Sequence, residues 1–312
     1  MKMSHQSKKH GIELKPGTSI VGKWHNKRYA IIKKLGNGAI GSVYLCEVGG
    51  KRVALKISDK SMSMTMEVNV LKSLQKVQGK TLGPYLVDVD DWVTPHGHVL
   101  SFYVMEYLRG QSLSTFIKQN GNTWVGVFML QLLDDLAELH KAGWVFGDLK
   151  EDNLLILHSP PKIRWIDVGG TTQIGRAIKE YTEFYDRGYW GMGSRRAEPS
   201  YDLFALVMVF VKLYYPNQFE RGSNPETAIL SRIKNVAPLR PYLPCLAKAI
   251  QGKYQSSAEM KRDVEQILNS PKPTSKPVLS RKRRKQKASI LVESTGISLI
   301  ALFYYIVSLI LP

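Results

Sequence analysis

Apolar and polar residues alternate differently in the two halves of the chain. Five short runs in the first third predict strands, at residues 29–35, 43–48, 51–57, 85–92 and 99–105. Between the third and fourth runs, residues 61–75 carry an apolar face with helical spacing. A strong helical period follows over 123–141, and residues 203–215 are almost entirely apolar, which is typical of a buried helix. The pattern predicts an α+β fold, with strands first and helices after them.

The two ends of the chain differ from this middle part. Residues 1–26 are polar and aperiodic, which predicts a flexible leader, and they contain no apolar run of the kind found in secretory signals. Residues 270–288 are rich in Pro, Lys and Arg, which predicts an extended linker. Residues 289–312 are apolar apart from Glu293 and a few hydroxyl groups, and are long enough to form a transmembrane helix. The remaining residues, 27–269, are expected to form the folded domain.

Charge and cysteine content narrow the class of protein. The net charge of the 312 residues is +18, and residues 272–287 hold eight basic and no acidic residues, which leaves +10 for the rest. This excess favours anionic partners such as nucleotides, nucleic acid or acidic lipid, although a solvated basic surface is the simpler explanation. Cys46 and Cys245 are the only cysteines and lie far apart, so a disulfide framework is not expected and a reducing cytosol fits.

A glycine-rich segment follows the first predicted strand. Gly36, Asn37, Gly38, Gly41 and Val43 belong to a G-x-G-x-x-G-x-V pattern. Glycines let the backbone approach a phosphate closely and offer it N–H groups. In dinucleotide-binding folds such a motif opens a helix, but here strand-like sequence follows, so a hairpin flap over a nucleotide fits better. An ordinary glycine hairpin is the alternative that this motif leaves open.

Two charged residues come next. Lys56 ends the Val-Ala-Leu-Lys run of the third strand, and Glu67 is the only acid in the helix predicted at 61–75. An isolated lysine on a strand is usually just exposed, and a helical glutamate is often only solvated. Their order after the glycine segment favours a functional pair.

The densest candidate chemistry lies at residues 144–153 and 163–169. Asp148 precedes Asn153 by five residues, with Lys150 between them, and Asp167 follows the next strand-like run. These side chains supply a base for a hydroxyl group, two oxygen ligands for Mg²⁺ and a cation for a migrating phosphoryl group. The set therefore indicates phosphoryl transfer.

The pattern Asp-x-Lys-x-x-Asn followed by Asp-x-Gly resembles the catalytic and metal-binding loops of Hanks-type serine/threonine protein kinases. Together with the glycine and lysine motifs, the resemblance extends from about residue 28 to 268. It implies a two-lobed protein-kinase fold, with a five-stranded antiparallel N-lobe carrying one helix and a mostly helical C-lobe. It also implies ATP and Mg²⁺ (or Mn²⁺) as cofactors, and serine and threonine hydroxyl groups of proteins as acceptors.

The resemblance also implies roles for single residues. Lys56, oriented by Glu67, would hold the α- and β-phosphates, and Lys150 would screen the γ-phosphate. Asp148 would be the catalytic base, and Asn153 and Asp167 would bind the metal.

The resemblance also implies that some residues contact adenine and that others are structural. Glu106 and Leu108 lie in the segment that resembles the hinge between the kinase lobes, where adenine binds. His140 is expected to be structural. Asp202 is expected to brace the backbone of the catalytic loop, with a simple helix N-terminal acid as the alternative.

The chain departs from the family in three places. Phe146-Gly147-Asp148 replaces His-Arg-Asp, so the arginine that grips an activation-segment phosphate is missing. Phe146 is expected to pack in place of the histidine. We therefore expect activity to depend little on phosphorylation of the activation-segment threonines through that route, although they could be sites of autophosphorylation; they are Thr171, Thr172 and Thr182. Val168 replaces the usual phenylalanine, so the packing of the spine is expected to be smaller. A clear Ala-Pro-Glu is absent, so the substrate-docking part of the C-lobe is expected to be abbreviated or altered.

Two other classes remain open at this stage. Phe-Gly-Asp and Ile-Asp-Val-Gly also resemble small-molecule phosphotransferases of the aminoglycoside and choline kinase type. Lys150 and the full glycine motif favour a protein kinase over that class. A pseudokinase scaffold is the third candidate. It is disfavoured because the chain keeps all five expected residues, which are Lys56, Glu67, Asp148, Asn153 and Asp167.

A basic cluster in the linker, Arg281, Lys282, Arg283, Arg284, Lys285 and Lys287, precedes the apolar tail. Such a cluster marks the cytoplasmic side of a single-pass tail anchor and attracts acidic lipid headgroups. Its charge density also favours non-sequence-specific binding to DNA phosphates. An anchored kinase without an external sensor is similar to the YabT-type kinases of spore-forming bacilli, which implies a role in sporulation and stimulation by nucleic acid. The expected partners are protein substrates, acidic lipid, DNA and a second copy of the chain.

Overall fold

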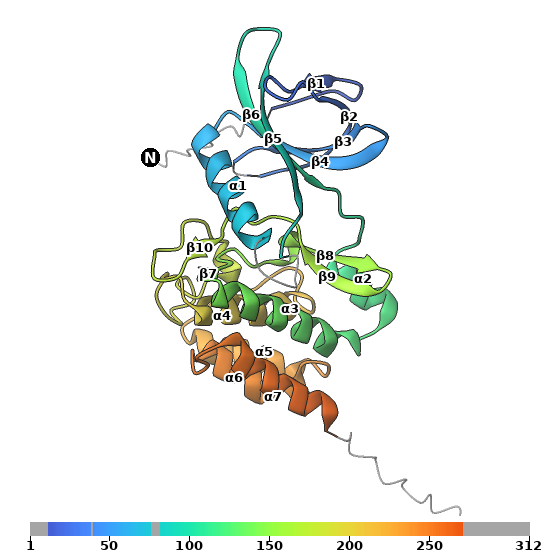
Figure 1. Ribbon diagram of the computed structural model, residues 1–312. Coiled ribbons are helices and arrows are strands. Elements are labelled where there is room, and N and C mark those ends of the chain that lie inside the picture. Colours follow the sequence, from blue (N-terminus) through green and yellow to red (C-terminus); the bar gives the residue numbers. More distant parts are fainter. Residues whose placement is uncertain (1–11, 39, 76–81, 271–312) are drawn as a thin grey trace, which may run out of the picture. The chain divides into compact units, whose positions relative to one another are not determined.

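The computed structural model describes residues 12–38, 40–75 and 82–270. Residues up to Leu268 form one compact unit. Within it, an antiparallel sheet with one helix makes an N-terminal lobe and a mostly helical region makes a C-terminal lobe (Figure 1). This is the two-lobed arrangement that the sequence predicted.

The N-terminal sheet has six antiparallel strands in the order β1-β2-β3-β4-β6-β5. Its strands are β1 (Ser19–Val21), β2 (Arg28–Asn37), β3 (Ser42–Val48), β4 (Lys51–Ser58), β5 (Leu86–Val93) and β6 (Val99–Glu106). One face buries a small cluster built around Ile20, Tyr29, Tyr44 and Phe102. Alternation of buried and exposed residues along β2 explains why this strand could be read from the sequence.

The prediction of five strands was wrong by one. Strand β1 lies within residues 1–26, which the sequence indicated to be a flexible leader, and it pairs with β2 through Ser19–Ala30 and Val21–Arg28. Ile20 is fully buried in the sheet core. A three-residue strand is too short to produce a periodic signal, so only its pairing with β2 reveals it.

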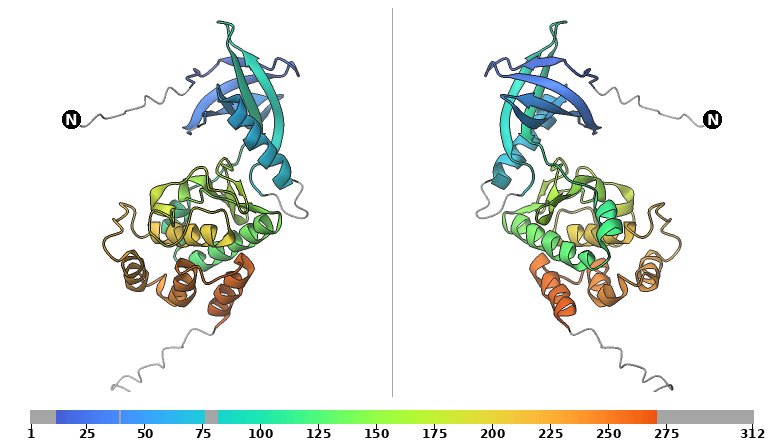
Figure 2. Two further views of the ribbon diagram at one scale, coloured as in Figure 1. Left: turned by 90° about the vertical axis from the view of Figure 1, so that its left-hand side faces the viewer. Right: turned by 90° about the vertical axis from the view of Figure 1, so that its right-hand side faces the viewer.

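Helix α1 (Ser61–Gln75) packs against the N-terminal sheet, as its apolar face predicted. Its buried face includes Glu67 as well as Val68 and Leu71. A buried glutamate among apolar residues needs a partner, because an unpaired charge is costly away from water. The views of Figure 2 show this helix alongside the strands.

The C-terminal lobe contains the remaining helices and two short antiparallel strand pairs. Its helices are α2 (Leu113–Asn120), α3 (Trp124–Lys141), α4 (Pro199–Lys212), α5 (Pro225–Asn235), α6 (Leu243–Ile250) and α7 (Ser257–Asn269). Its 3₁₀ turns are η1 (Glu151–Asn153), η2 (Glu183–Tyr185) and η3 (Arg240–Tyr242). Its strands are β7 (Trp144–Val145), β8 (Leu154–His158), β9 (Pro161–Trp165) and β10 (Thr172–Gln173); β7 pairs with β10 and β8 with β9.

Helix α4 is the centre of this lobe. Its residues Tyr201–Val211 are all buried, including Asp202 near its start. Figure 1 shows α3, α4 and α6 close together, and α4 contacts both α3 and α6. The nearly all-apolar run predicted at 203–215 therefore lies in the core up to Val211, but the helix ends at Lys212, three residues earlier than the sequence indicated.

The linker and tail predictions concern residues that the structure, apart from Ser270, does not describe. Residues 271–312, which hold the basic cluster and the apolar run, lie outside the described residues. Within the ranges that the structure describes, none of the helices has the length and apolar character needed to cross a membrane.

Candidate active site

Lys56 and Glu67 form a buried ion pair between β4 and α1. The ammonium nitrogen lies 2.8 Å from one Glu67 carboxylate oxygen and 2.9 Å from the other. Both side chains are about 3% exposed or less. The Tyr103 hydroxyl on β6 donates a further hydrogen bond of 2.8 Å to Glu67. Two donors on one carboxylate hold it in place, so the lysine is aimed toward the catalytic residues of the C-lobe.

Electrostatics keep the Lys56 ammonium charged. Burial alone would lower the pKa of Lys56, but the carboxylates of Asp167 and Glu67 outweigh this, so its pKa lies above the ordinary value. Asp167 Oδ2 lies 3.6 Å from the ammonium nitrogen. A permanent cation at this place suits the phosphates of a nucleotide.

The loop between β7 and η1 brings Asp148 and Lys150 together. Lys150 Nζ lies 2.5 Å from Asp148 Oδ2 and 3.2 Å from Thr182 Oγ1. The Thr182 hydroxyl donates to Asp148 Oδ1 at 3.1 Å. Thr182 therefore occupies the place where a base and a cation meet, rather than standing in an exposed loop. From the sequence, Thr182 was expected only to be a residue that could be phosphorylated.

Asn153 and Asp167 approach the same cavity from two loops. The Asn153 amide nitrogen donates to the Asp148 carbonyl at 2.8 Å, which leaves its amide oxygen available. The Gly169 N–H donates to Asp167 Oδ1 at 2.9 Å, while the Asp167 side chain remains 40% exposed. Two hard oxygen donors of this kind, completed by phosphate oxygens and water, suit a divalent cation such as Mg²⁺. The residues present thus fit the metal that the sequence implied.

Asp202, near the start of α4, holds the backbone of the catalytic loop in place. Its carboxylate accepts the backbone N–H groups of Phe146 and Gly147 at 2.7 and 3.0 Å. His140 Nε2 lies 2.9 Å from the same carboxylate, and Ser257 Oγ lies 2.9 Å from His140 Nδ1. This confirms Asp202 as the brace and His140 as a structural histidine. The Phe146 ring packs edge-on against Trp165, as an apolar replacement for histidine should.

The backbone explains why glycine stands at position 147. Gly147 has φ +81°, and a Cβ added there would lie 2.5 Å from the carbonyl oxygen of Gly170. A side chain is therefore excluded both by conformation and by space. The loss of the phosphate-gripping arginine is thus built into the path of this loop.

The glycine flap connects β2 to β3. Gly38 N–H donates to the Gly41 carbonyl at 2.9 Å, and Ser42 Oγ donates to Asn37 Oδ1 at 2.7 Å. Added Cβ atoms at Gly36 and Gly38 would meet nothing closer than 3.7 Å, whereas one at Gly41 would lie 2.4 Å from the carbonyl oxygen of Ile57. The first two glycines therefore leave free space for a ligand, and the third permits close packing onto β4. Val43 pairs with Lys56 across the sheet.

The predicted hinge follows directly from β6. The Glu106 carboxylate accepts a hydrogen bond from Arg164 and another from the Tyr85 N–H, and its own N–H donates to the Tyr85 carbonyl at 2.9 Å. This side chain is therefore tied to the C-lobe residue Arg164, and Leu108 is half-buried two residues on. Contact of these two residues with adenine stays a prediction.

A small cavity brings the predicted residues into one place. Lys56, Glu67, Asp148, Asn153 and Asp167 line it from both lobes, together with Gly38, Ile40, Gly169, Gly170 and Glu180. Glu180, in the activation segment, is an additional acid that the sequence reading missed, because nothing in a polar, aperiodic segment indicates where it folds back. Tyr103 was missed for a similar reason, since it lies in a strand 36 residues from its partner Glu67.

The end of the activation segment is held by ion pairs in place of an Ala-Pro-Glu motif. Arg187 Nη2 binds the Glu198 carboxylate at 2.5 Å, and Arg195 binds the fully buried Asp186 at 2.7 Å. Asp186 also accepts the Tyr201 hydroxyl at 2.9 Å. These contacts fix the end of the segment, and an abbreviated or altered substrate-docking region stays a prediction.

Comparison with known proteins decides the family. The protein kinase domain matches residues 29–278 of the chain. The chain belongs to the protein kinase family. It is 51% identical over 252 residues to the serine/threonine-protein kinase YabT of Bacillus subtilis (strain 168), covering 80% of this chain and 75% of that protein. It is 29% identical over 208 residues to the cell division control protein 2 homolog 2 of Trypanosoma brucei brucei, covering 60% and 56% of the two chains.

A solved structure supports the fold. The chain is similar to vaccinia related kinase 3, with a TM-score of 0.59 and 15% sequence identity over 82% of this chain and 91% of that one. At this identity the likeness concerns the fold alone. The family match and the bacterial relative together show that the chain is a serine/threonine protein kinase. Such a kinase acts on proteins with ATP and a divalent metal.

Proposed function

We propose that this kinase uses Asp148 to orient and deprotonate a protein hydroxyl group, with Lys150 neutralising charge on the transferred phosphoryl group. The observation that carries this is the double contact of one hydroxyl, that of Thr182, with Asp148 and Lys150. A substrate hydroxyl bound beside it would meet the same base and the same cation. General bases positioned in this way contribute about 10²–10⁴-fold to rate.

The other predicted residues have positioning roles in this proposal. Lys56, held by Glu67, binds the α- and β-phosphates, and the flap at 36–43 covers them. Asn153 and Asp167 would hold Mg²⁺ or Mn²⁺. The metal, when bound, neutralises charge on the phosphate oxygens. The adenine would contact the hinge at Glu106 and Leu108.

The test is phosphoryl transfer by the full-length protein. Labelled ATP is incubated with casein, with an aminoglycoside and with choline, using wild type and Asp148→Asn. We expect label on serine and threonine of casein, and at least about a hundredfold less with Asp148→Asn. Label on a small molecule alone, or equal label with both proteins, would contradict the proposed role.

The chain is further proposed to be anchored in the membrane through residues 289–312, with the catalytic domain on the cytoplasmic side. The support is an uncharged run from Ser294 to Pro312 directly after a basic cluster. Placing Arg at Leu299 and at Leu302 should release the protein from membranes, because each charge at the centre of a helix costs roughly 3 kcal/mol. Fractionation of cells that express wild type or this double variant measures it.

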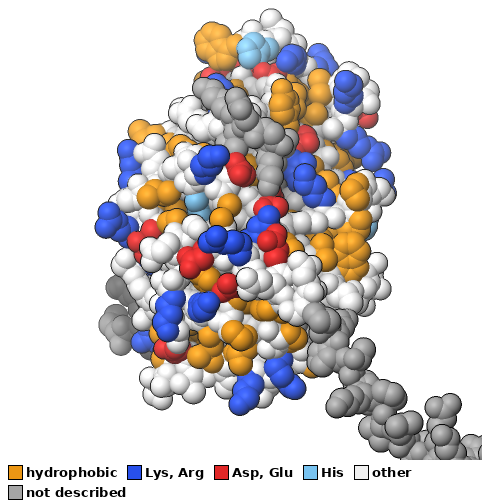
Figure 3. Space-filling view, turned by 60° about the horizontal axis from the view of Figure 1, so that its bottom comes forward, with side chains coloured by type: hydrophobic (Ala, Val, Ile, Leu, Met, Phe, Trp, Pro, Cys, Tyr) orange, Lys and Arg blue, Asp and Glu red, His pale blue; other side chains and the backbone are white. Residues whose placement is uncertain are grey.

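The basic cluster at 281–287 is proposed to bind DNA phosphates in addition to lipid headgroups. On the face of the catalytic domain shown in Figure 3, basic and acidic side chains lie intermixed. A variant with all six cluster residues changed to Gln should lose the electrophoretic shift of a DNA duplex that wild type produces. Equal mobility with both full-length proteins would remove this idea. A sporulation role, a homodimer and autophosphorylation stay predictions from the resemblance.

A further inference from the structure

Two consecutive serines stand at the start of helix α7, and they have different partners. Ser256 Oγ accepts a hydrogen bond of 3.3 Å from the backbone N–H of Glu259, which is the usual role of a serine at the start of a helix. Ser257 is only 1% exposed, and its hydroxyl group points elsewhere, to His140 Nδ1 on α3 at 2.9 Å. Capping of the helix therefore accounts for Ser256 but not for the buried Ser257.

Packing fixes the place of the Ser257 hydroxyl group. Ser257, Met260 and Val264 lie on one face of α7 by their helical spacing, and all three are buried. On the same helix, the Asp263 carboxylate accepts a hydrogen bond of 2.7 Å from the Tyr254 hydroxyl group. These contacts hold α7 against the segment before it, so the serine is a fixed hydrogen-bond partner for the histidine.

His140 connects this serine to Asp202. Only 7% of its side chain is exposed, and Nε2 lies 2.9 Å from Asp202 Oδ2. An ionised carboxylate only accepts hydrogen bonds, so Nε2 carries the hydrogen atom between them. Nδ1 of a neutral ring is then an acceptor, and the Ser257 hydroxyl group donates to it. The ring therefore has a hydrogen bond at each nitrogen, and the two bonds together oppose its rotation.

The Asp202 carboxylate transmits the position of the ring to the catalytic loop. Its Oδ2 accepts both the Phe146 N–H and the histidine, and its Oδ1 accepts the Gly147 N–H. These two loop residues directly precede Asp148. A shift of the histidine ring would therefore disturb the carboxylate oxygen that also holds the loop backbone.

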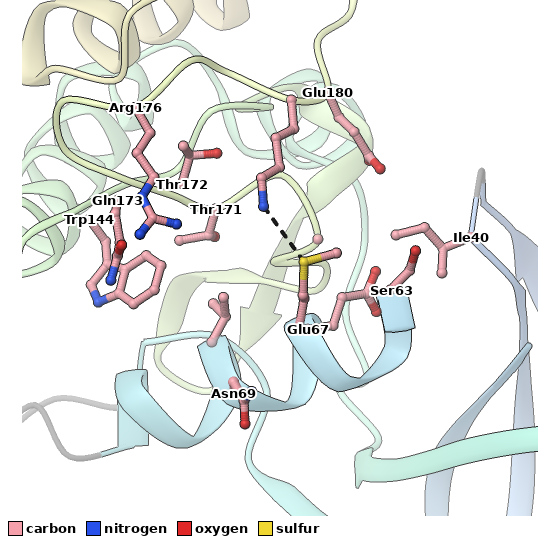
Figure 4. A pocket seen from close by; sticks show the side chains of 14 residues that line it. Ile40, Ser63, Glu67, Asn69, Trp144, Thr171, Thr172, Gln173, Arg176 and Glu180 are labelled. Atoms are coloured by element: carbon pink, nitrogen blue, oxygen red, sulfur yellow. Dashed lines mark hydrogen bonds between the residues drawn. The ribbon is translucent and has the colours of Figure 1, made fainter. Parts of the chain in front are cut away.

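Close packing does not by itself fix the chain before Asp148. Trp144 belongs to β7, a strand of two residues, and borders a cavity of about 260 Å³ together with Thr172 and Gln173 of β10 (Figure 4). A cavity beside a strand restrains it less than a filled core would, because dispersion contacts are missing on that side. The loop therefore depends on its hydrogen bonds to Asp202.

We propose that Ser257 is a positioning residue for phosphoryl transfer, which fixes the His140 ring and, through Asp202, the loop that carries Asp148. Without the hydroxyl group, a buried ring nitrogen lacks a partner, which is unfavourable. The ring then turns toward another donor and loses part of its hydrogen bond to the carboxylate. Ser257 has this role only if Asp148 is the base proposed above, because the loop matters through that residue.

Steady-state kinetics of the full-length protein on casein test the role. Thermal unfolding first establishes the folded fraction of each variant, and rates refer to folded protein. We expect Ser257→Ala to lower kcat about tenfold with KM for ATP unchanged, because the reacting groups are misplaced while the Lys56 contacts stay intact. Ser256→Ala is the matched control: it removes the neighbouring hydroxyl group and a helix cap, so it should lower stability but leave kcat unchanged.

A double variant tests whether the serine acts through the ring. In a His140→Gln background, Ser257→Ala should change kcat no further, because residues that act in series are not additive. A wild-type kcat for Ser257→Ala, or an equal further loss in the His140→Gln background, would overturn the proposal. Asp148→Asn is measured alongside. If it keeps wild-type activity, the proposed base is wrong, whereas its inactivity beside an unaffected Ser257→Ala removes only the role of the serine.

Nitrogen NMR of the histidine-labelled protein provides a readout that a general loss of stability does not change. The signals of His140 are assigned by their absence from the spectrum of His140→Gln. We expect Ser257→Ala to shift the Nδ1 signal of this histidine, because its hydrogen-bond donor is gone, and to leave the other histidines unchanged. Ser256→Ala should give the wild-type spectrum. An unshifted Nδ1 signal in Ser257→Ala would contradict the contact on which the positioning role depends.

Discussion

At the scale of single residues, the active site depends on burying charges that are fully paired. Lys56 and Glu67 are both almost inaccessible, and either alone would be strongly unfavourable in the N-lobe core. Tyr103 supplies the remaining hydrogen bond to the carboxylate, and its own pKa lies well above 10, because of burial and then the Glu67 charge. The lysine that binds phosphate is therefore positioned by two other side chains.

Tyr103→Phe is expected to lower stability without removing the ion pair. It deletes a buried hydrogen bond to a charged acceptor, worth about 2 kcal/mol, while the ring stays in place. This should lower the melting temperature by about 4–8 °C, as measured by thermal unfolding. Tyr85→Phe is the control, because Tyr85 is 56% exposed and should change little. Equal melting temperatures for the two variants would contradict this reading of Tyr103.

Thr182 permits a test that separates positioning from phosphorylation. Thr182→Val keeps the shape but removes the hydroxyl that contacts Asp148 and Lys150, so activity should fall about tenfold or more. Thr182→Ser keeps the hydroxyl and should retain most of the activity. Initial rates on casein decide between these outcomes. A serine variant as inactive as the valine variant would show that the methyl group matters instead.

At the scale of elements, α4 is the platform on which the catalytic loop is built. The helix is buried along Tyr201–Val211, and its one acid, Asp202, points its carboxylate at two backbone N–H groups of the loop. A carboxylate near the start of a helix also complements the helix dipole. One residue thus couples the core of the C-lobe to the geometry around Asp148.

Asp202→Ala should therefore affect both stability and activity. It leaves two buried N–H groups and His140 without their acceptor, which costs about 3–5 kcal/mol. Thermal unfolding and rates on casein measure the two effects. Asp134→Ala is the comparison, because it removes an acid from a partly exposed pair with Lys261 and should cost at most about 1 kcal/mol. Similar losses for both variants would refute the bracing role.

At the scale of the whole molecule, the N-lobe sheet has one core cluster, and a larger cluster joins α1 to the helices of the C-lobe. Each of these two clusters holds one buried free cysteine. Cys46 lies in the N-lobe sheet cluster, and Cys245 lies with the helices of the C-lobe. Burial raises the pKa of both thiols from 9.0 to about 12. Folding therefore favours the neutral thiol in both lobes.

The thiols should make the protein less stable in alkali. Below pH 9 both thiols are neutral in the folded and in the unfolded chain, so the protein keeps its full stability with respect to these two groups. As pH rises from 9 toward 12, thiols ionise in the unfolded chain but not yet in the folded one, so stability falls by about 1.4 kcal/mol per pH unit for each thiol. The melting temperature of wild type should fall more steeply above pH 9 than that of Cys46→Ala/Cys245→Ala. Parallel curves would show that other groups dominate.

The sequence by itself determined the elements and the chemistry. Period-2 and helical spacing located the N-lobe strands β2 to β6 and the helices α1, α3 and α4, because those signals depend only on neighbours along the chain. Asp148, Lys150 and Asn153 are also near neighbours along the chain, so their proximity in the structure could be predicted from their spacing. These features depend on residues that are close in the chain, so they can be predicted from the sequence alone.

Only the tertiary structure decided which distant residues meet. Strand β1, the Tyr103 contact with Glu67, the place of Thr182 beside Asp148, and the return of Glu180 to the cleft all join segments far apart in the chain. Their positions depend on how the lobes fold and on which buried polar groups need partners. Gly147 shows the same division, since the missing arginine can be read in the sequence but its cause, a backbone that excludes any side chain, lies in the packing against Gly170.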